Sequence, residues 1–184
     1  EEHMRNAADV MIASGMADYG YQYVNIDDCW MKKKGDEPYR DQQGAVLPNS
    51  KFPDIKGMVD YIHGKGLKAG LYTGPGPWTC AGYVASYEHE RVDAEKFAEW
   101  GFDFLKHDWC SYTQVAGGKD LEHLQRPYKK MGDILKTLPR DISDPVKQGE
   151  VIVEIDTRDM DRIVAQSRVS KRASEARLAS ARQN

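Results

Sequence analysis

The chain lacks any long apolar run and any marked excess of charge. None of its 184 residues falls in a stretch approaching the roughly 20 apolar residues of a membrane-spanning helix, so we expect no transmembrane segment. Lys and Arg number 26 against 29 Asp and Glu, for a formal net charge of −3. This balance gives no reason to expect a nucleic-acid-binding protein. The first residues, Glu-Glu-His, also lack the basic and apolar regions of a signal peptide.

Residues 143–184 lack aromatic residues, Cys and His altogether. The 10 Tyr, 4 Trp and 4 Phe of the chain all precede them, and Ala, Ser and Arg are common in their place. A segment of this length and composition cannot build a hydrophobic core alone. The sequence therefore predicts two parts, residues 1–142 and an unrelated-looking tail of residues 143–184.

Apolar periodicity in the first part predicts alternating helices and strands. The expected helices cover residues 7–17, 55–64, 92–100 and 121–138, and the expected strands cover residues 21–27, 67–73 and 102–107. Continuous apolar strands between helices indicate an α/β fold whose parallel sheet is buried on both faces. Polar side chains end each strand, which favours part of a (β/α)8 barrel. A flavodoxin-like open sheet is the alternative, although no glycine-rich phosphate loop supports dinucleotide binding.

Three carboxylates at predicted strand ends are the sharpest candidates for chemistry: Asp27, Asp28 and Asp108. Three negative charges brought close together destabilise the fold unless a ligand, a cation or hydrogen-bond donors satisfy them. Lys106 lies two residues before Asp108 and on the same face of the strand, where it would keep that carboxylate ionised. An ionised carboxylate suits a nucleophile or a hydrogen-bond acceptor.

Two other interpretations of these residues stay open. In the first, Asp27 or Asp28 caps the next segment and Lys106 makes a structural ion pair. In the second, the three carboxylates and His107 bind a metal ion. The metal site is disfavoured, because His107 points to the opposite face and Lys106 repels a cation.

The three cysteines allow more than one arrangement. Cys80 and Cys110 follow neighbouring predicted strands, so their side chains can come within bonding distance. Because the number of cysteines is odd, Cys29 would then remain outside any disulfide within this chain. Three thiols in a reducing compartment are the alternative.

Five sequence blocks in order resemble the α-galactosidase (melibiase) and α-N-acetylgalactosaminidase family of retaining glycoside hydrolases. The resemblance covers residues 2–142. The blocks are YVNIDDCW at 23–30, KFP at 51–53, HGKGLKAGLY at 63–72, TCAG at 79–82 and LKHDWC at 105–110.

The resemblance implies a (β/α)8 barrel that hydrolyses terminal α-linked galactosides, in oligosaccharides or glycoconjugates, without a cofactor. By the match, Asp108 is the nucleophile that forms a glycosyl-enzyme, and Lys106 contacts sugar hydroxyls. The remaining matches are Asp27 and Asp28 as acceptors for galactose hydroxyls, Tyr72 in the pocket wall, and Cys80–Cys110 as the family's disulfide. An exported enzyme, periplasmic or extracellular, is also implied.

Some features depart from the family's pattern. The family's first strand is expected before residue 1, and its acid/base Asp belongs to a later strand that we do not find here. We therefore expect this chain alone to be inactive. Trp109 is bulky where a small residue is common, and residues 74–78 (GPGPW) replace the usual Asp-containing loop. Galactose, N-acetylgalactosamine and arabinopyranose all remain open as the sugar.

The tail resembles a different class of protein. Residues 145–156 are similar to the lipoyl-type strand of periplasmic membrane-fusion (efflux adaptor) proteins, and residues 158–184 to the start of their helical hairpin. We expect a short β segment and then a helix. A non-catalytic adaptor is thus the rival function, and a half-barrel completed by another chain is a third. The longer resemblance favours the glycoside hydrolase.

Overall fold

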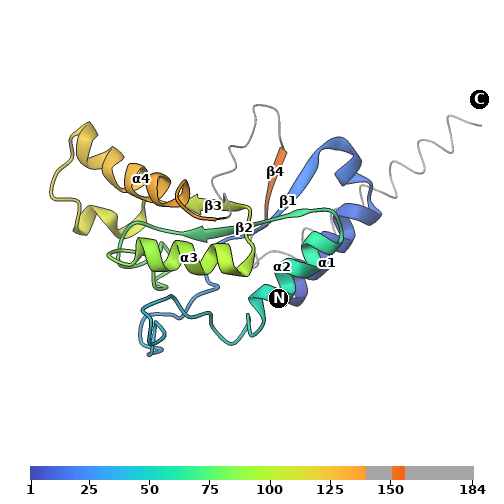
Figure 1. Ribbon diagram of the computed structural model, residues 1–184, viewed down its shortest axis with the longest axis horizontal. Coiled ribbons are helices and arrows are strands. Elements are labelled where there is room, and N and C mark those ends of the chain that lie inside the picture. The colour runs from blue at the N-terminus through green and yellow to red at the C-terminus, as the bar shows by residue number, and fades with distance from the viewer. Residues whose placement is uncertain (140–150, 156–184) are drawn as a thin grey trace, which may run out of the picture.

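The structure is a computed structural model that describes residues 1–139 and 151–155 (Figure 1). Its sheet contains four strands: β1 (Tyr21–Ile26), β2 (Lys68–Thr73), β3 (Phe104–His107) and β4 (Val151–Ile155). The helices are α1 (Glu2–Ala13), α2 (Ile55–Gly64), α3 (Glu90–Trp100) and α4 (Leu121–Leu135), with 3₁₀ helices η1 (Met16–Tyr19) and η2 (Cys110–Gln114). None of the described helices has the length and apolar character needed to cross a bilayer.

All strand pairs are parallel, and the spatial order is β3-β2-β1-β4. Strands β1, β2 and β3 thus lie side by side in chain order, unlike the flavodoxin-like order in which the first strand lies between the second and third. The register aligns Asn25 with Gly70 and Gly70 with Phe104. A Cβ on Gly70 would lie 1.8 Å from the Asn25 Oδ1 atom, so only glycine fits between these neighbours.

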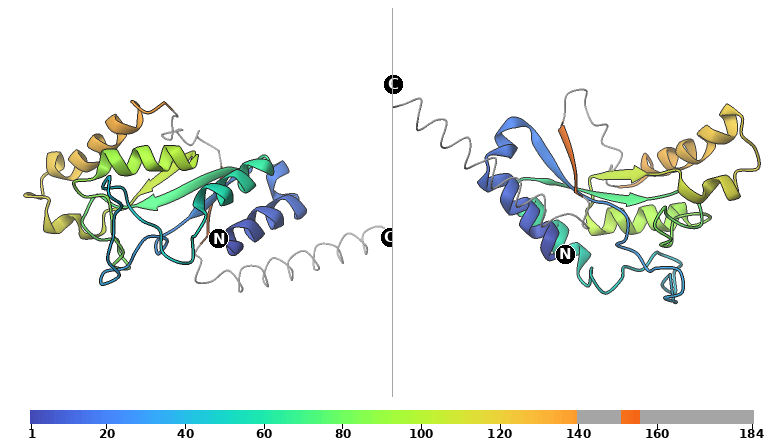
Figure 2. Two further views of the ribbon diagram at one scale, coloured as in Figure 1. Left: turned by 60° about the horizontal axis from the view of Figure 1, so that its bottom comes forward. Right: turned by 180° about the vertical axis from the view of Figure 1, so that it is seen from behind.

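The helices and the sheet share one hydrophobic core. Successive helices contact one another, α1 with α2, α2 with α3 and α3 with α4, and Figure 2 shows α1, α2 and α3 along one side of the sheet. Helix α2 illustrates the pattern, because its buried residues recur at helical spacing: Ile55, Met58, Val59 and Ile62. Its N-terminus is capped by Asp54, whose Oδ1 accepts from the Gly57 amide at 2.9 Å.

Several sequence-based expectations were wrong in detail. Three elements differ by more than one residue in one bound: α3 begins at Glu90, β3 begins at Phe104 and α4 ends at Leu135. The helix expected at 7–17 is α1, which begins at Glu2 and ends at Ala13, because Gly15 adopts φ +76° and the chain then turns into η1. Strand β3 is half-buried rather than buried on both faces. The short β segment expected in the tail is β4, which pairs with β1, whereas the expected tail helix lies outside the described residues.

The loop after β1 is fixed by two side chains, the buried Trp30 and the partly buried Arg40. The Trp30 indole donates to the Tyr72 carbonyl at 2.7 Å and packs edge-on against Phe97 and Trp100. Further along, the Arg40 guanidinium pairs with Asp93 of α3 at 2.6 Å and donates to a carbonyl of the loop after β2. These contacts fasten the loops that surround the carboxyl ends of the strands.

Candidate active site

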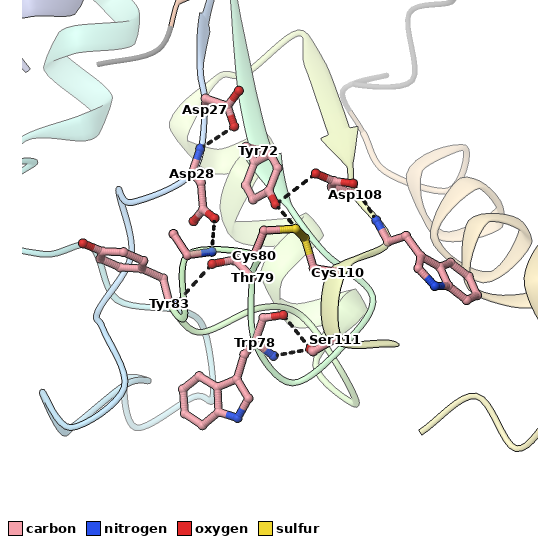
Figure 3. The surroundings of a disulfide bond; sticks show 12 residues. Asp27, Asp28, Tyr72, Trp78, Thr79, Cys80, Tyr83, Asp108, Cys110 and Ser111 are labelled. Atoms are coloured by element: carbon pink, nitrogen blue, oxygen red, sulfur yellow. Dashed lines mark hydrogen bonds between the residues drawn. A yellow bond between two sulfur atoms is a disulfide. The ribbon is translucent and has the colours of Figure 1, made fainter. Parts of the chain in front are cut away.

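Asp108 lies immediately after β3, at the sheet edge where β1 and β2 also end (Figure 3). Its backbone amide donates to the Thr73 carbonyl at 2.9 Å, which holds it against the end of β2. Its carboxylate accepts at both oxygens, from the Trp109 amide at 2.8 Å and from the Tyr72 hydroxyl at 3.3 Å. The carboxylate is therefore oriented by groups that are themselves anchored.

Tyr72 is the centre of this arrangement. Its side chain is buried in β2, and its hydroxyl lies 3.2 Å from the Cys110 Sγ atom as well as beside Asp108. Burial raises the pKa of the Tyr72 phenol well above its usual value, and the negative charges of Asp28 and Asp108 raise it further. The phenol consequently stays protonated and acts as a hydrogen-bond donor at neutral pH.

Lys106 forms an ion pair with Asp27, at 3.1 Å between Nζ and Oδ2. Its support of the ionised state of Asp108 stays a prediction. In the sheet register Lys106 lies beside Tyr72, and its ammonium group lies 5.3 Å from the centre of the Tyr72 ring. From there it reaches across β2 to the end of β1. Both partners are partly exposed, 37% for Lys106 and 23% for Asp27, so a ligand can reach them.

Asp28 organises the loop that carries Cys80. Its two carboxylate oxygens accept from the Cys29 amide at 2.7 Å and from the Ala81 amide at 2.9 Å. The Asp27 carboxylate likewise accepts from the Asp28 amide at 2.6 Å. Both aspartates thus make the local backbone contacts that the capping interpretation predicts, while they also lie in the cluster around Asp108.

The structure decides between the cysteine arrangements. Cys80 and Cys110 form a disulfide with a Cα–Cα distance of 4.9 Å, and Cys29 keeps its thiol. The bond joins the loop after β2 to the segment after β3. It therefore lies beside Tyr72 and Asp108, as Figure 3 shows.

His107 takes no part in this cluster, and the four-residue metal alternative gains no support. Its ring faces Tyr128 of α4 at 5.8 Å, and within the described residues neither ring nitrogen has a hydrogen-bond partner. Burial lowers the pKa of His107 to about 4. The one group of potential metal ligands found in the described ranges is Cys80, Asp108 and Cys110, and its cysteines are already joined in the disulfide.

Two residues that shape the site carry no signal of that role in the sequence. Trp30 is one of them: it lies in the YVNIDDCW motif, and its indole fixes the backbone of Tyr72. Ser111 is the other, and its hydroxyl contacts the main chain of Trp78, 33 residues away. No local pattern signals a contact between loops so far apart in the chain.

Known proteins resemble most of the chain. It is 42% identical over 145 residues to an alpha-galactosidase of Oryza sativa subsp. japonica, an alignment that covers 77% of this chain and 32% of the relative. It is 51% identical over 106 residues to the probable alpha-galactosidase B of Aspergillus oryzae, covering 56% of this chain and 23% of the relative. The crystal structure of alpha-galactosidase I from Mortierella vinacea superposes with a TM-score of 0.68 at 37% identity, covering 74% of this chain and 33% of that one.

The chain thus spans at most about a third of the length of these relatives. None of the relatives described above is an efflux adaptor. The sequence model of one family matches the chain past residue 142. That model, described as alpha galactosidase A (Melibiase_2), matches residues 1–166. The chain therefore belongs to the alpha galactosidase A family of glycoside hydrolases.

Proposed function

We propose that this chain carries the nucleophile-bearing part of a retaining α-galactosidase site. One observation carries the proposal: the Asp108 carboxylate is held at both oxygens, by Trp109 and by Tyr72, at the edge where Asp27, Asp28 and Lys106 gather. The names of the relatives indicate the sugar, and the substrate class is therefore terminal α-linked galactosides.

In the proposed reaction, Asp108 attacks the anomeric carbon as the bond to the leaving oxygen breaks, which gives a galactosyl ester. Retaining enzymes need a second carboxyl group about 5 to 5.5 Å away to protonate that oxygen and later to activate water. By the family resemblance, that residue belongs to a later strand. We therefore expect no measurable hydrolysis of α-galactosides by the 184-residue chain itself.

The other residues at this edge act on the sugar hydroxyls. The Lys106 ammonium group donates hydrogen bonds, and the Asp27 and Asp28 carboxylates accept them. Adjacent hydroxyls of galactose suit such paired donors and acceptors. The buried Tyr72 ring, with Lys106 above it, forms the wall between Asp27 and Asp108.

We further propose that the sheet is an arc of a (β/α)8 barrel, in which β1, β2 and β3 are consecutive strands. Their parallel order and the contacts between successive helices support this placement. The disulfide beside Tyr72 supports an oxidising location, periplasmic or extracellular.

Binding of galactose to the isolated chain tests the site without requiring turnover. We expect galactose to shift the NMR amide signals of residues 27–28, 72 and 106–109 at millimolar concentration. Glucose, which differs only in the configuration at C4, should shift them at least several-fold less. Asp27→Asn should weaken the galactose response about tenfold, because it removes a charged acceptor.

The matched control is Asp60→Asn, which changes an exposed carboxylate of α2. Equal responses to the two sugars, or a response unaffected by Asp27→Asn, would contradict the proposed site. Hydrolysis of methyl α-galactoside, whose leaving oxygen must be protonated, that disappears in Asp108→Asn would show that the chain already contains an acid/base residue.

A further inference from the structure

Two loops meet beside Asp108 and are joined twice. The disulfide links Cys80 of the loop after β2 to Cys110 at the start of η2. The adjacent residue, Ser111, provides the second link. Its hydroxyl donates to the Trp78 carbonyl at 2.6 Å and accepts from the Trp78 amide at 2.9 Å (Figure 3).

The backbone of the first loop approaches Ser111 as closely as glycine allows. A Cβ on Gly76 would lie 2.3 Å from the Ser111 Oγ atom and 2.6 Å from the Tyr112 amide nitrogen. Such distances leave no room for a side chain. The packing of Gly76 and the two hydrogen bonds of Ser111 thus hold the loops together by contacts that do not include the disulfide.

This second link lies next to the candidate nucleophile. Ser111 follows Asp108 by three residues, and the intervening Cys110 has its Sγ atom 3.2 Å from the Tyr72 hydroxyl. That hydroxyl donates to the Asp108 carboxylate. A displacement of the segment carrying Ser111 therefore moves both the sulfur and the carboxylate that Tyr72 contacts.

We propose that Ser111 is a positioning residue. It holds the loop of Cys80 against the segment of Asp108 and keeps the two cysteines close together when their disulfide is reduced. The Ser111 link and the disulfide favour the same arrangement of the loops, so each stabilises the other by thermodynamic reciprocity. This inference does not depend on the substrate proposed above.

Equilibrium of the full chain with reduced and oxidised glutathione tests the proposal. In this reaction two glutathione molecules supply two electrons and two protons to the protein disulfide, giving two protein thiols and one glutathione disulfide. Alkylation and peptide mass spectrometry then give the reduced fraction at Cys80 and Cys110, separately from the Cys29 thiol. Because Ser111→Ala removes two hydrogen bonds, it should shift the equilibrium constant toward the dithiol about tenfold, which raises the reduction potential by about 30 mV.

Two variants serve as controls. Thr79→Val removes a hydroxyl of the same loop that accepts from the Tyr83 amide at 3.0 Å, a contact within the loop, and should shift the equilibrium less than twofold. Ser111→Thr retains the hydroxyl and should restore most of the wild-type value. A folded Ser111→Ala variant with the wild-type equilibrium would overturn the proposal, as would an equal shift in Thr79→Val.

Amide hydrogen exchange provides a readout that needs no substitution. In the reduced wild-type chain, the Trp78 amide should remain protected by its bond to Ser111, with exchange slowed at least tenfold relative to an unstructured amide. Unprotected exchange of this amide in a reduced chain that is otherwise folded would also contradict a positioning role for Ser111.

Discussion

At the scale of single residues, the site combines oriented carboxylates with anchored neighbours. The Asp108 carboxylate accepts from two neutral groups, the Trp109 amide and the Tyr72 hydroxyl, and the Lys106 ammonium pairs with Asp27. Sequence spacing placed Lys106 and Asp108 on one face of a strand but did not reveal this pairing. The reach of a lysine side chain across a neighbouring strand depends on strand register, which a single sequence does not specify.

His107 shows how position on a strand separates neighbouring residues. It directly precedes Asp108, yet its ring is turned toward α4, as alternation along a strand requires. The ring, whose two nitrogens are buried, is uncharged, because burial lowers its pKa to about 4 and the nearby Glu90 and Asp108 charges offset only part of that effect. Its protonation should therefore affect folding stability.

We predict that His107→Phe flattens the acid side of the stability profile. The unfolded imidazole has a pKa near 6.5 and the folded one a pKa of about 4, so between these values the unfolded chain binds the extra proton. His107 thus lowers the free energy of unfolding as pH falls, by up to about 1.4 kcal/mol per pH unit in that window. Above pH 7 this loss is absent.

Urea unfolding from pH 4 to 8 measures this effect. The difference in unfolding free energy, His107→Phe minus wild type, should grow as the pH decreases from about 6.5 toward 4. His3→Gln, a change on the exposed side of α1, is the control and should run parallel to wild type. Parallel profiles for His107→Phe and wild type would contradict the neutral, buried state of His107.

At the scale of elements, the sequence was most informative where periodicity is strong. Helix α2 covers the expected range from 55 to 64, with its apolar stripe in the core and Asp54 as its cap. The C-terminal end of α1 was misplaced, because Met16 continued the apolar pattern beyond Gly15. Conformation at one glycine decided that boundary, and apolar spacing carries no information about it.

The long loop after β1 was the least predictable element. It is fixed by the ion pair between Arg40 and Asp93, which lie 53 residues apart. Asp93 is fully buried, and burial raises its carboxyl pKa while the guanidinium of Arg40 opposes that increase. The same carboxylate oxygen accepts from the Val46 amide at 2.9 Å. Charge and spacing alone do not distinguish this pair from exposed ones.

We predict that Arg40→Ala lowers the free energy of unfolding by about 3 to 5 kcal/mol, because it leaves a buried carboxylate without its cation. The matched control is Lys56→Ala, which breaks the exposed Lys56–Asp60 pair of α2 and should cost less than about 1 kcal/mol. Thermal and urea unfolding at neutral pH measure both. Similar losses in the two variants would show that the Arg40 pair does not fasten the loop.

At the scale of the whole molecule, the comparisons support the predicted family of residues 1–142. They do not test the predicted division of the chain into two parts. The α/β class, the parallel sheet and the glycoside hydrolase family follow from residues in the first 110 positions, and all three are confirmed. In the tail, β4 joins the same sheet beside β1. The proposed boundary after residue 142 stays a prediction.

We propose that Asp108 is the nucleophile and that the acid/base residue belongs to a later strand of the family's barrel. α-Galactosyl fluoride tests this role of Asp108, because fluoride leaves without a proton from an acid. The residue that protonates the leaving group also activates water in the second step of a retaining mechanism, so in its absence the galactosyl ester should accumulate. We expect one galactosyl group on the peptide that contains Asp108.

Peptide mass spectrometry after incubation with this fluoride is therefore the decisive measurement. We predict the adduct at Asp108 in wild type and in the control Asp120→Asn, which changes the exposed cap of α4, and its absence in Asp108→Asn. An adduct on another carboxylate, an adduct that persists in Asp108→Asn, or no adduct on a folded wild-type chain would contradict the assignment of Asp108 as nucleophile.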